Sequence, residues 1–438
     1  MSTLKEELLL KLENKTAKLG VVGLGYVGLP LAVEKAKAGY EVIGFDVQDE
    51  KVKLVNEGHN YIGDILDEDL KDLVKAGKLK ATTDFSFVAE VDAVAIAVPT
   101  PLDKFKQPDV SYVENSTKSI AKYIHRGMLV VLESTTYPGT TEEIVKPILE
   151  ESGLKCGEDF FLAFSPERVD PGNKQFKTKN TPKVVGGITE DCTEVAAALY
   201  SNVLEGDIHK VSSPAVAEME KILENTFRHI NIGLVNEMAI LCKKMGIDIW
   251  EVIEAAKTKP YGFMAFYPGP GLGGHCIPLD PFYLTYKARE FDYHTRLIET
   301  AGEINDFMPE FVVDNAMKLL NGDKKSLNGS KVLLMGVAYK KDIDDMRESP
   351  ALKVIEHLEK NGAEVMYNDP YVPNFKHGGK EYASVEWEKA IDKADIVIIT
   401  TDHTDYDYEE IVKRAKIFYD TRNASSAVKN NREKIHKL

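Results

Sequence analysis

Paired cysteines and long apolar runs are both missing from this 438-residue sequence. Its four cysteines, at positions 156, 192, 242 and 276, lie far apart and form no C-x-x-C pair. This argues against a disulfide framework or a structural zinc site and fits reduced thiols. The longest nearly apolar stretch, residues 21–33, is too short to cross a bilayer, and residues 1–18 lack the apolar core of a signal peptide. We therefore expect a soluble, cytoplasmic protein without a metal site.

An excess of positive charge is also lacking, since the formal net charge is −15. A diffuse acidic surface repels phosphate at long range, which argues against a nucleic-acid or anionic-membrane partner. An anionic small substrate would need a local cluster of Lys and Arg. The composition, 43% hydrophobic and 29% charged, is typical of packed globular domains, and the length fits two or three of them.

Short apolar runs alternate with polar, helix-compatible stretches in the N-terminal half. Runs this short and rich in Val and Ile suit strands of a parallel sheet that is buried on both faces. Their alternation with helical segments predicts a doubly wound α/β domain. The predicted strands are residues 19–22, 42–45, 93–98, 129–132 and 161–164, with a helix over 31–38 after the first.

The middle of the chain has a different pattern. Apolar residues recur at three- and four-residue spacing from Ser213 to Met245, which predicts one long helix that ends near Gly246. Such a helix can join domains and form a dimer surface. Residues 267–281 are rich in Gly and Pro and predict a loop.

Strands are predicted again at 331–337, 364–370, 395–402 and 416–420. The expected fold class is therefore α/β, with two Rossmann-like doubly wound domains joined by a long central helix and a helical region. The expected division is 1–212, 213–321 and 322–438.

The first predicted strand runs into a G-x-G-x-x-G turn formed by Gly23, Gly25 and Gly28. Such a turn lets the backbone approach a pyrophosphate at a helix N-terminus. Asp46 ends the second strand, where a carboxylate accepts hydrogen bonds from ribose hydroxyls and repels a 2′-phosphate. This favours NAD over NADP. The second α/β domain has only Gly336 after its first strand, so it lacks this fingerprint.

A glycine-rich loop, GLGGHCIPLDP, surrounds Cys276, and Asp280 follows four residues later. An isolated cysteine is usually a small buried apolar residue, which we accept for the other three. The glycines favour a reactive thiol here, and we interpret His275 as structural or substrate-facing. On the long helix, Lys221 and Asn225 share a face, which could stabilise an oxyanion or simply be solvated; Arg228 lies a turn further along.

Together these segments resemble the UDP-glucose/GDP-mannose dehydrogenase family, the four-electron nucleotide-sugar 6-dehydrogenases. The resemblance covers essentially the whole chain beyond the first fifteen residues or so. The motifs that carry it are GLGYVGLPLA (23–32), VPTP (98–101), ESTTYPGTT (133–141), FSPERVDPGN (164–173), EMEKILENTFR (218–228), GLGGHCIPLDP (271–281) and GVAYKKDIDDMRESPA (336–351). It implies an N-terminal NAD-binding domain, dimer contacts on the long helix and a C-terminal domain for the UDP moiety.

The resemblance also implies a role for individual residues. Cys276 matches the nucleophile, Lys221 the lysine that assists proton transfer and stabilises oxyanions, with Asn225 beside it. Asp280 matches the aspartate that orients water and lysine, and Glu167 a glutamate of the hydrolytic step. The residues expected at NAD are Gly23, Gly25, Tyr26, Val27, Gly28, Asp46, Lys51, Thr100, Thr135 and Arg347. Those expected at the UDP-sugar are Arg168, Val169, Lys221, Asn225, Arg228, Gly271 and Lys340.

The expected reaction is the oxidation of a sugar C6 alcohol to a carboxylate through a thiohemiacetal and a thioester on Cys276. The segment 258–284 most resembles the UDP-N-acetylglucosamine 6-dehydrogenases, which make a uronic acid for surface polysaccharides. UDP-N-acetylmannosamine and UDP-glucose are the alternative substrates. A two-electron hydroxy-acid dehydrogenase and a non-catalytic NAD sensor are the alternative functions, and the Cys276 loop argues against both. We expect a homodimer or a higher homo-oligomer.

Overall fold

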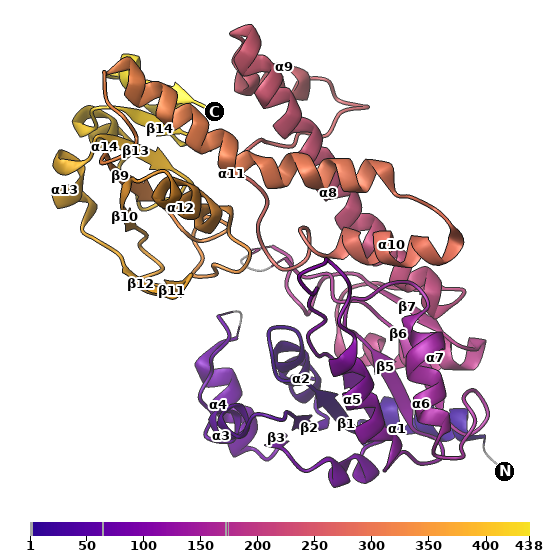
Figure 1. Ribbon diagram of the computed structural model, residues 1–438. Coiled ribbons are helices and arrows are strands. Elements are labelled where there is room, and N and C mark those ends of the chain that lie inside the picture. The colour runs from indigo at the N-terminus through magenta and orange to yellow at the C-terminus, as the bar shows by residue number, and fades with distance from the viewer. Residues whose placement is uncertain (1–2, 64, 171–172, 174) are drawn as a thin grey trace. The chain divides into compact units, whose positions relative to one another are not determined.

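The computed structural model describes residues 3–63, 65–170, 173 and 175–438 (Figure 1). The chain forms two compact units, one of residues 1–224 and 282–293 and the other of residues 225–281 and 294–438. Pro171 and Gly172, which belong to the FSPERVDPGN motif, lie outside the described residues.

An eight-stranded sheet in the order β3-β2-β1-β4-β5-β6-β7-β8 forms the centre of the first unit. All neighbouring strands are parallel except β6 and β7. The strands are β1 (Lys18–Val22), β2 (Glu41–Phe45), β3 (Leu79–Thr82), β4 (Ala93–Ile96), β5 (Leu129–Leu132), β6 (Phe161–Phe164), β7 (Lys183–Gly187) and β8 (Ile208–Val211).

Both faces of this sheet are buried because its side chains alternate between two hydrophobic cores. Leu19 and Val21 of β1 pack in one core with residues of the helices α1, α2 and α7, whereas Val22 packs in the other with residues of α5 and α6. This is the doubly wound arrangement that apolar runs without polar alternation indicate. The helices are α1 (Leu4–Glu13), α2 (Gly28–Lys37), α3 (Asp49–Asn56), α4 (Asp67–Lys75), α5 (Ser111–Ala121), α6 (Lys146–Glu150) and α7 (Glu190–Val203).

The predicted long helix is α8 (Pro214–Met245), which begins with a proline and ends before Gly246 at φ +72°. Proline suits the first turn of a helix, and a left-handed glycine suits its end. Three further helices follow it along the chain: α9 (Ile249–Lys257), α10 (Asp280–Ala288) and α11 (Arg296–Gly322).

The second unit has a five-stranded parallel sheet in the order β10-β9-β13-β14-β15. Val332 and Leu334 of β9 pack with α11 and α12 on one face, whereas Leu333 and Met335 pack with α14 on the other. Its elements are β9 (Lys331–Met335), α12 (Pro350–Lys360), β10 (Glu364–Asn368), α13 (Trp387–Ala390), β13 (Ile396–Ile399), α14 (Tyr408–Arg414), β14 (Phe418–Asp420), β15 (Ile435–Lys437) and the hairpin β11 (Asn374–His377) and β12 (Lys380–Ala383).

The predicted fold class is confirmed, with corrections to individual elements. Strands predicted to reach 98, 337, 370 and 402 end at Ile96, Met335, Asn368 and Ile399, because the residues that follow lie in turns and loops. The strand predicted from 416 begins at Phe418. The helix predicted from 31 begins at Gly28, and the predicted loop 267–281 ends where α10 begins at Asp280. The strands β3, β8 and β15 and the hairpin were not predicted, since they are short and partly exposed. Strand β7 was not predicted, since the lysine and two glycines of its sequence KVVGG leave only two apolar side chains.

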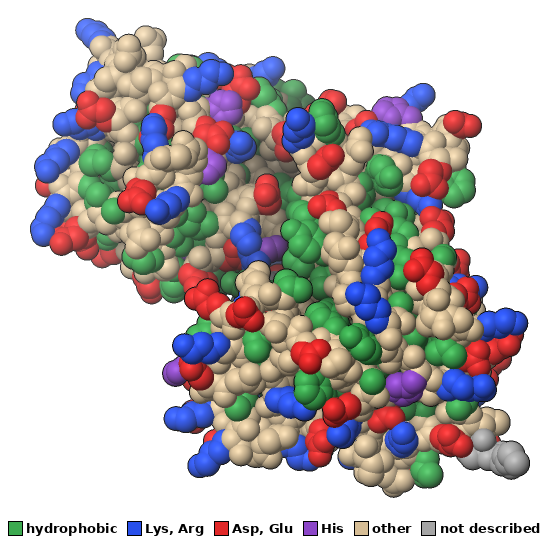
Figure 2. All heavy atoms as spheres, turned by 60° about the horizontal axis from the view of Figure 1, so that its bottom comes forward, with side chains coloured by type: hydrophobic (Ala, Val, Ile, Leu, Met, Phe, Trp, Pro, Cys, Tyr) green, Lys and Arg blue, Asp and Glu red, His purple; other side chains and the backbone are tan. Residues whose placement is uncertain are grey.

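No described helix combines the length and the apolar character needed to cross a membrane. On the face that Figure 2 shows, Lys and Arg side chains are interspersed with Asp and Glu rather than gathered into one basic surface.

Candidate functional site

The carboxyl ends of β1, β2, β4, β5 and β6 lie at one edge of the first sheet, because these strands are parallel. Strand β1 lies between β2 and β4, so the chain crosses the sheet in opposite directions from β1. Dinucleotides bind at such a switch point in open α/β sheets. The loops that follow these strands carry most of the predicted NAD residues.

The glycine turn after β1 requires glycine at two positions for packing. A Cβ on Gly23 (φ +90°) would lie 2.4 Å from the Ala97 carbonyl oxygen, and one on Gly28 would lie 1.8 Å from the Gly23 carbonyl oxygen. A Cβ on Gly25, by contrast, would meet no atom within 4 Å. The backbone at Gly25 therefore faces open space next to the N-terminus of α2, which fits a bound pyrophosphate.

Asp46 is fixed next to this turn. Its Oδ2 accepts a hydrogen bond from the Leu24 amide (2.9 Å), its Oδ1 accepts one from the Gln48 amide (3.0 Å), and Lys51 Nζ lies 3.7 Å from Oδ2. The carboxylate is 7% exposed. The fold thus brings Asp46 and Lys51 to the glycine turn, as NAD binding through a ribose requires.

Thr100 and Thr135 lie on the loops after β4 and β5, and the structure brings them together. Thr100 Oγ1 donates a hydrogen bond to the Thr135 carbonyl (2.6 Å), and the Tyr283 hydroxyl donates one to the Thr100 carbonyl. Tyr26 is 45% exposed, and Val27 is half-buried at the start of α2. Arg347 lies in the second unit.

Glu167 follows β6, and its Oε1 accepts hydrogen bonds from the amides of Arg168 and Val169, both at 2.9 Å. The Arg168 guanidinium donates through Nε and Nη2 to Glu224 of α8 and through Nη1 to the Pro182 carbonyl (3.0 Å). Burial would raise the pKa of Glu224, but the hydrogen bond from Arg168 holds it below its ordinary value. Arg168 thus ties the Glu167 loop to α8 in the first unit.

In the second unit, the Cys276 loop is tied to a buried amide–carboxylate pair. Asn225 Nδ2 donates to Asp280 Oδ2 at 2.6 Å, and these residues are 6% and 2% exposed. The Asp280 amide in turn donates to the Cys276 carbonyl at 2.8 Å, and Cys276 itself is half-buried and not part of a disulfide. The three predicted residues therefore form one hydrogen-bonded group.

The glycines before Cys276 allow close packing against the first loop of the second sheet. A Cβ on Gly273 would lie 2.8 Å from Tyr339 Cβ, and the Gly274 amide donates to the Arg347 carbonyl at 3.2 Å. His275 Nε2 lies 3.5 Å from Asp345 Oδ2, and Arg347 donates to both oxygens of the same carboxylate. The sequence alone indicated that these glycines let the backbone approach a ligand. In the structure, Gly273 and Gly274 let the backbone approach Tyr339 and Arg347.

Four other predicted residues differ in burial. Lys221 is 7% exposed, so the alternative of a solvated helix face is wrong for both Lys221 and Asn225. Arg228 is exposed on α8, and Lys340 is half-buried after β9. Gly271 is buried with φ +137°, a conformation that L side chains rarely adopt.

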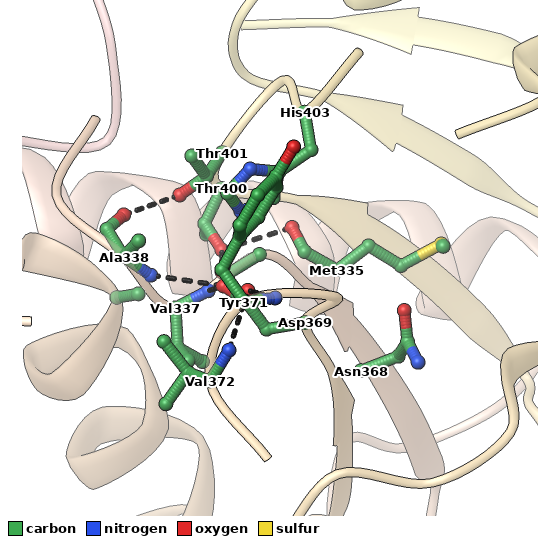
Figure 3. Close-up of polar contacts among 12 residues, drawn as sticks. Met335, Val337, Ala338, Asn368, Asp369, Tyr371, Val372, Thr400, Thr401 and His403 are labelled. Carbon is green, nitrogen blue, oxygen red and sulfur yellow. Dashed lines mark hydrogen bonds and ion pairs between the residues drawn. The ribbon is translucent and has the colours of Figure 1, made fainter. Parts of the chain in front are cut away.

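The end of β10 carries a second aspartate in the position that Asp46 has after β2 (Figure 3). Asp369 Oδ2 accepts hydrogen bonds from the Val337 amide (2.7 Å), the Ala338 amide (3.1 Å) and His403 Nε2 (3.0 Å). Its Oδ1 accepts hydrogen bonds from two more amides, at 2.8 and 3.1 Å. The protein uses both oxygens fully, so this acid is not available to a ribose. The second sheet has the nucleotide fold without the NAD site.

Sequence reasoning missed a buried charge cluster beneath Glu167. Lys183 Nζ lies 2.7 Å from Glu133 Oε2, and both side chains are 5% exposed or less. The Tyr200 hydroxyl donates to the other oxygen of Glu133. The available signal was a lysine at the start of the otherwise apolar run KVVGG and a glutamate directly after LVVL.

The sheet order, the glycine turn and Asp46 define an NAD-binding α/β protein. Family models for UDP-glucose/GDP-mannose dehydrogenases match the chain three times, as the NAD-binding domain (residues 17–204), the central domain (215–307) and the UDP-binding domain (333–427). The chain belongs to this family and is an NAD-dependent nucleotide-sugar dehydrogenase.

Named relatives agree with this assignment. The chain is 40% identical to a UDP-N-acetyl-D-glucosamine 6-dehydrogenase of Pseudomonas aeruginosa over 82% of this chain and 84% of that one. It is 37% identical to a UDP-N-acetyl-D-mannosamine dehydrogenase of Pyrococcus horikoshii, over 93% and 95%. A solved structure of a P. horikoshii UDP-D-ManNAc dehydrogenase superposes with a TM-score of 0.85 at 37% identity, covering 94% of this chain and 96% of that one.

The position of Asp46 predicts how the chain discriminates between NAD and NADP. Asp46→Ala is expected to weaken NAD binding by roughly 10- to 100-fold, because hydrogen bonds to a charged group are worth about 1.5–3 kcal/mol. It should also raise the ratio of kcat/KM for NADP to that for NAD, since the repulsive charge is gone. Asp46→Asn, which keeps an acceptor for the Leu24 amide, is the control for damage to the turn. An unchanged Kd for NAD in Asp46→Ala would place the adenosine end elsewhere.

Proposed function

We propose that the enzyme oxidises the C6 hydroxyl of UDP-N-acetyl-D-glucosamine to the uronic acid with two NAD per sugar, for surface polysaccharide synthesis. The observation that carries the proposal is the buried Asn225–Asp280 pair hydrogen-bonded to the backbone of Cys276. Burying an amide and a carboxylate together is costly unless each has a partner. Such a pair, tied to the backbone of a half-buried cysteine, supports a reaction site in this loop.

In the proposed mechanism, C6 first loses a hydride while its hydroxyl loses a proton, which gives an aldehyde. The Cys276 thiolate then adds to the aldehyde carbon and forms a thiohemiacetal. Loss of a second hydride from C6, together with the proton of the thiohemiacetal hydroxyl, gives a thioester. Water adds to the thioester carbon, the carbon–sulfur bond breaks, and the products are the carboxylate and the free thiol. NAD supplies the hydride acceptor for both oxidations.

The other roles follow from charge and hydrogen-bonding capacity. Lys221 stabilises the alkoxide that forms at C6, with Asn225 next to it on the helix. Asp280 or Glu167 accepts a proton from the attacking water. For NAD we propose contacts with Gly23, Gly25, Tyr26, Val27, Gly28, Asp46, Lys51, Thr100, Thr135 and Arg347. For the nucleotide sugar we propose Arg168, Val169, Lys221, Asn225, Arg228, Gly271 and Lys340.

The proposed sugar rests on two hydrogen-bond donors, Arg168 and His275, and on the names of similar proteins. Arg168 and His275 could donate hydrogen bonds to an acetamido carbonyl that UDP-glucose lacks. Three of the five guanidinium N–H groups of Arg168 already donate to Glu224 and Pro182, so the acetamido group would need the remaining ones. Two relatives named UDP-N-acetyl-D-glucosamine 6-dehydrogenase are 40% and 36% identical, and three named UDP-N-acetyl-D-mannosamine dehydrogenase are each 37% identical. The manno epimer is therefore the main alternative, ahead of UDP-glucose.

We also propose a homodimer or higher homo-oligomer through α8. Seven large apolar side chains along this helix are at least 44% exposed: Val216, Met219, Leu223, Phe227, Leu234, Leu241 and Met245. Their spacing is close to the three- and four-residue spacing of one helix face, and a contiguous apolar face marks an interaction surface. A sedimentation mass of one chain would contradict this proposal. We also propose a division into domains after residues 212 and 321 and a cytoplasmic location.

Cys276→Ser tests the covalent mechanism. Formation of the acid is expected to fall by roughly a thousandfold or more, because a serine hydroxyl is a far poorer nucleophile at neutral pH. Binding of NAD and of the nucleotide sugar, followed by calorimetry, should change little. Cys242→Ser, at a half-buried position on α8, is the matched control and should leave acid formation unchanged. Acid formation near the wild-type rate in Cys276→Ser would refute the mechanism.

A panel of nucleotide sugars tests the substrate. We expect the highest kcat/KM for UDP-N-acetylglucosamine, lower values for the manno and galacto epimers, and a value about a hundredfold or more lower for UDP-glucose. The reason is that a site built to hydrogen-bond a group rejects an analogue without it strongly. NADH absorbance at 340 nm gives the rates. If UDP-glucose or the manno epimer gave the highest kcat/KM, this substrate assignment would be overturned and the reaction class would stand.

A further inference from the structure

A buried lysine, Lys183, contacts the loop that carries Glu167. Lys183 is the first residue of β7, and its Nζ contacts three groups: Glu133 Oε2 at 2.7 Å, the Pro166 carbonyl at 3.2 Å and Glu167 Oε2 at 3.8 Å. The lysine side chain is 5% exposed and that of Glu167 is 16% exposed. The lysine therefore lies on the inner side of the loop, whereas the carboxylate of Glu167 is partly open to solvent.

The lysine is itself anchored by two other elements. Glu133 directly follows β5 and has no exposed side-chain surface, and Tyr200 of α7 donates a hydrogen bond to its Oε1. Burial would lower the pKa of Lys183, but the carboxylates of Glu133 and Glu167 raise it above its ordinary value, so the ammonium stays charged. Lys35 of α2 is also buried near this cluster, and burial lowers its pKa to about 8.

A purely structural role does not account for this arrangement. A buried ion pair is rarely more stabilising than apolar side chains of similar volume. Pairing with Glu133 alone would occupy only one N–H group of the lysine. Lys183 uses a second N–H on the residue directly before Glu167 and directs its charge at the Glu167 carboxylate. Because the other oxygen of Glu167 is held by two backbone amides, the carboxylate is fixed at both oxygens.

We propose that Lys183 is a positioning residue for the hydrolytic step, which holds the Glu167 carboxylate in the orientation that accepts a proton from the attacking water. This rests on the proposed function, in which Glu167 takes part in thioester hydrolysis. In that step the water oxygen bonds to the thioester carbon, a water proton passes to Glu167, and the carbon–sulfur bond breaks to release the Cys276 thiolate. No change of redox state is involved. Lys183 touches neither the water nor the thioester.

The test measures the covalent adduct on Cys276. The enzyme is mixed with NAD and UDP-N-acetylglucosamine, or with the manno epimer if the wild type prefers it. The reaction is quenched in acid, and the mass of the protein is measured by intact mass spectrometry. Lys183→Met should lower kcat about 10- to 100-fold, with little change in KM. This is less than the roughly 10²- to 10⁴-fold contribution of a proton acceptor, because Glu167 is misplaced and not removed. Acyl adduct should accumulate on Cys276. Lys183→Arg should recover much of kcat, and Lys179→Met, at an exposed lysine four residues earlier, should resemble the wild type.

The double variant Glu133→Gln/Lys183→Met separates positioning from folding. Lys183→Met alone leaves the Glu133 charge buried without its partner, which can prevent folding. The double variant removes both charges, so it should fold, as a thermal melt would show, and should still accumulate adduct. Wild-type kcat in the double variant would mean that Lys183 only neutralises Glu133, and the inference would fail.

Glu167→Gln distinguishes this inference from the proposed function. If Glu167→Gln accumulates no adduct, the proposed role of Glu167 is wrong, and the inference fails with it. If Glu167→Gln accumulates adduct and neither Lys183→Met nor the double variant does, only the inference is contradicted. Adduct in all three variants supports both.

Discussion

Parallel strand order is the constraint on which the NAD site depends. Because β1, β2, β4, β5 and β6 all run in the same direction, the loops after them leave from one edge of the sheet. The turn at Gly23, the carboxylate of Asp46, the Thr100–Thr135 hydrogen bond and the loop of Glu167 each follow one of these strands. Residues more than a hundred positions apart in the sequence thus lie at the same edge of the first sheet. The antiparallel strand β7 then carries Lys183 beneath the last of these loops.

Much of this could be predicted from the sequence, for physical reasons that differ between residues. The central strands β1, β4, β5 and β6 were recognisable because both faces of the sheet are buried there, which makes each of them a largely apolar run. Gly23 and Gly28 were recognisable because backbone contact excludes any Cβ there. Lys183 and Glu133 were missed because a buried ion pair joins two strands through space, and neither residue has a partner nearby in the sequence. The exact start of α10 was missed since Asp280, which begins it, follows a run of loop-forming residues.

The two nucleotide folds show how the same position can be used differently. Asp46 and Asp369 both follow the second strand of a parallel sheet and accept amide hydrogen bonds from the turn after the first strand. Asp46 accepts two amides and keeps capacity for a ligand, whereas Asp369 accepts four amides and His403. The missing glycines after β9 and the fully hydrogen-bonded Asp369 carboxylate therefore both indicate that the second sheet has no NAD site of this kind. One sheet retains the NAD site, and the other uses its acid to hold its own loops.

We propose that one active cysteine, Cys276, joins two oxidations at the same carbon. The number of NADH formed per nucleotide sugar consumed tests this proposal, with the sugar limiting and the product separated by chromatography. We expect two NADH and one uronic acid per sugar, without free aldehyde in solution. A ratio of one, with a released aldehyde as product, would contradict it and would support a two-electron dehydrogenase.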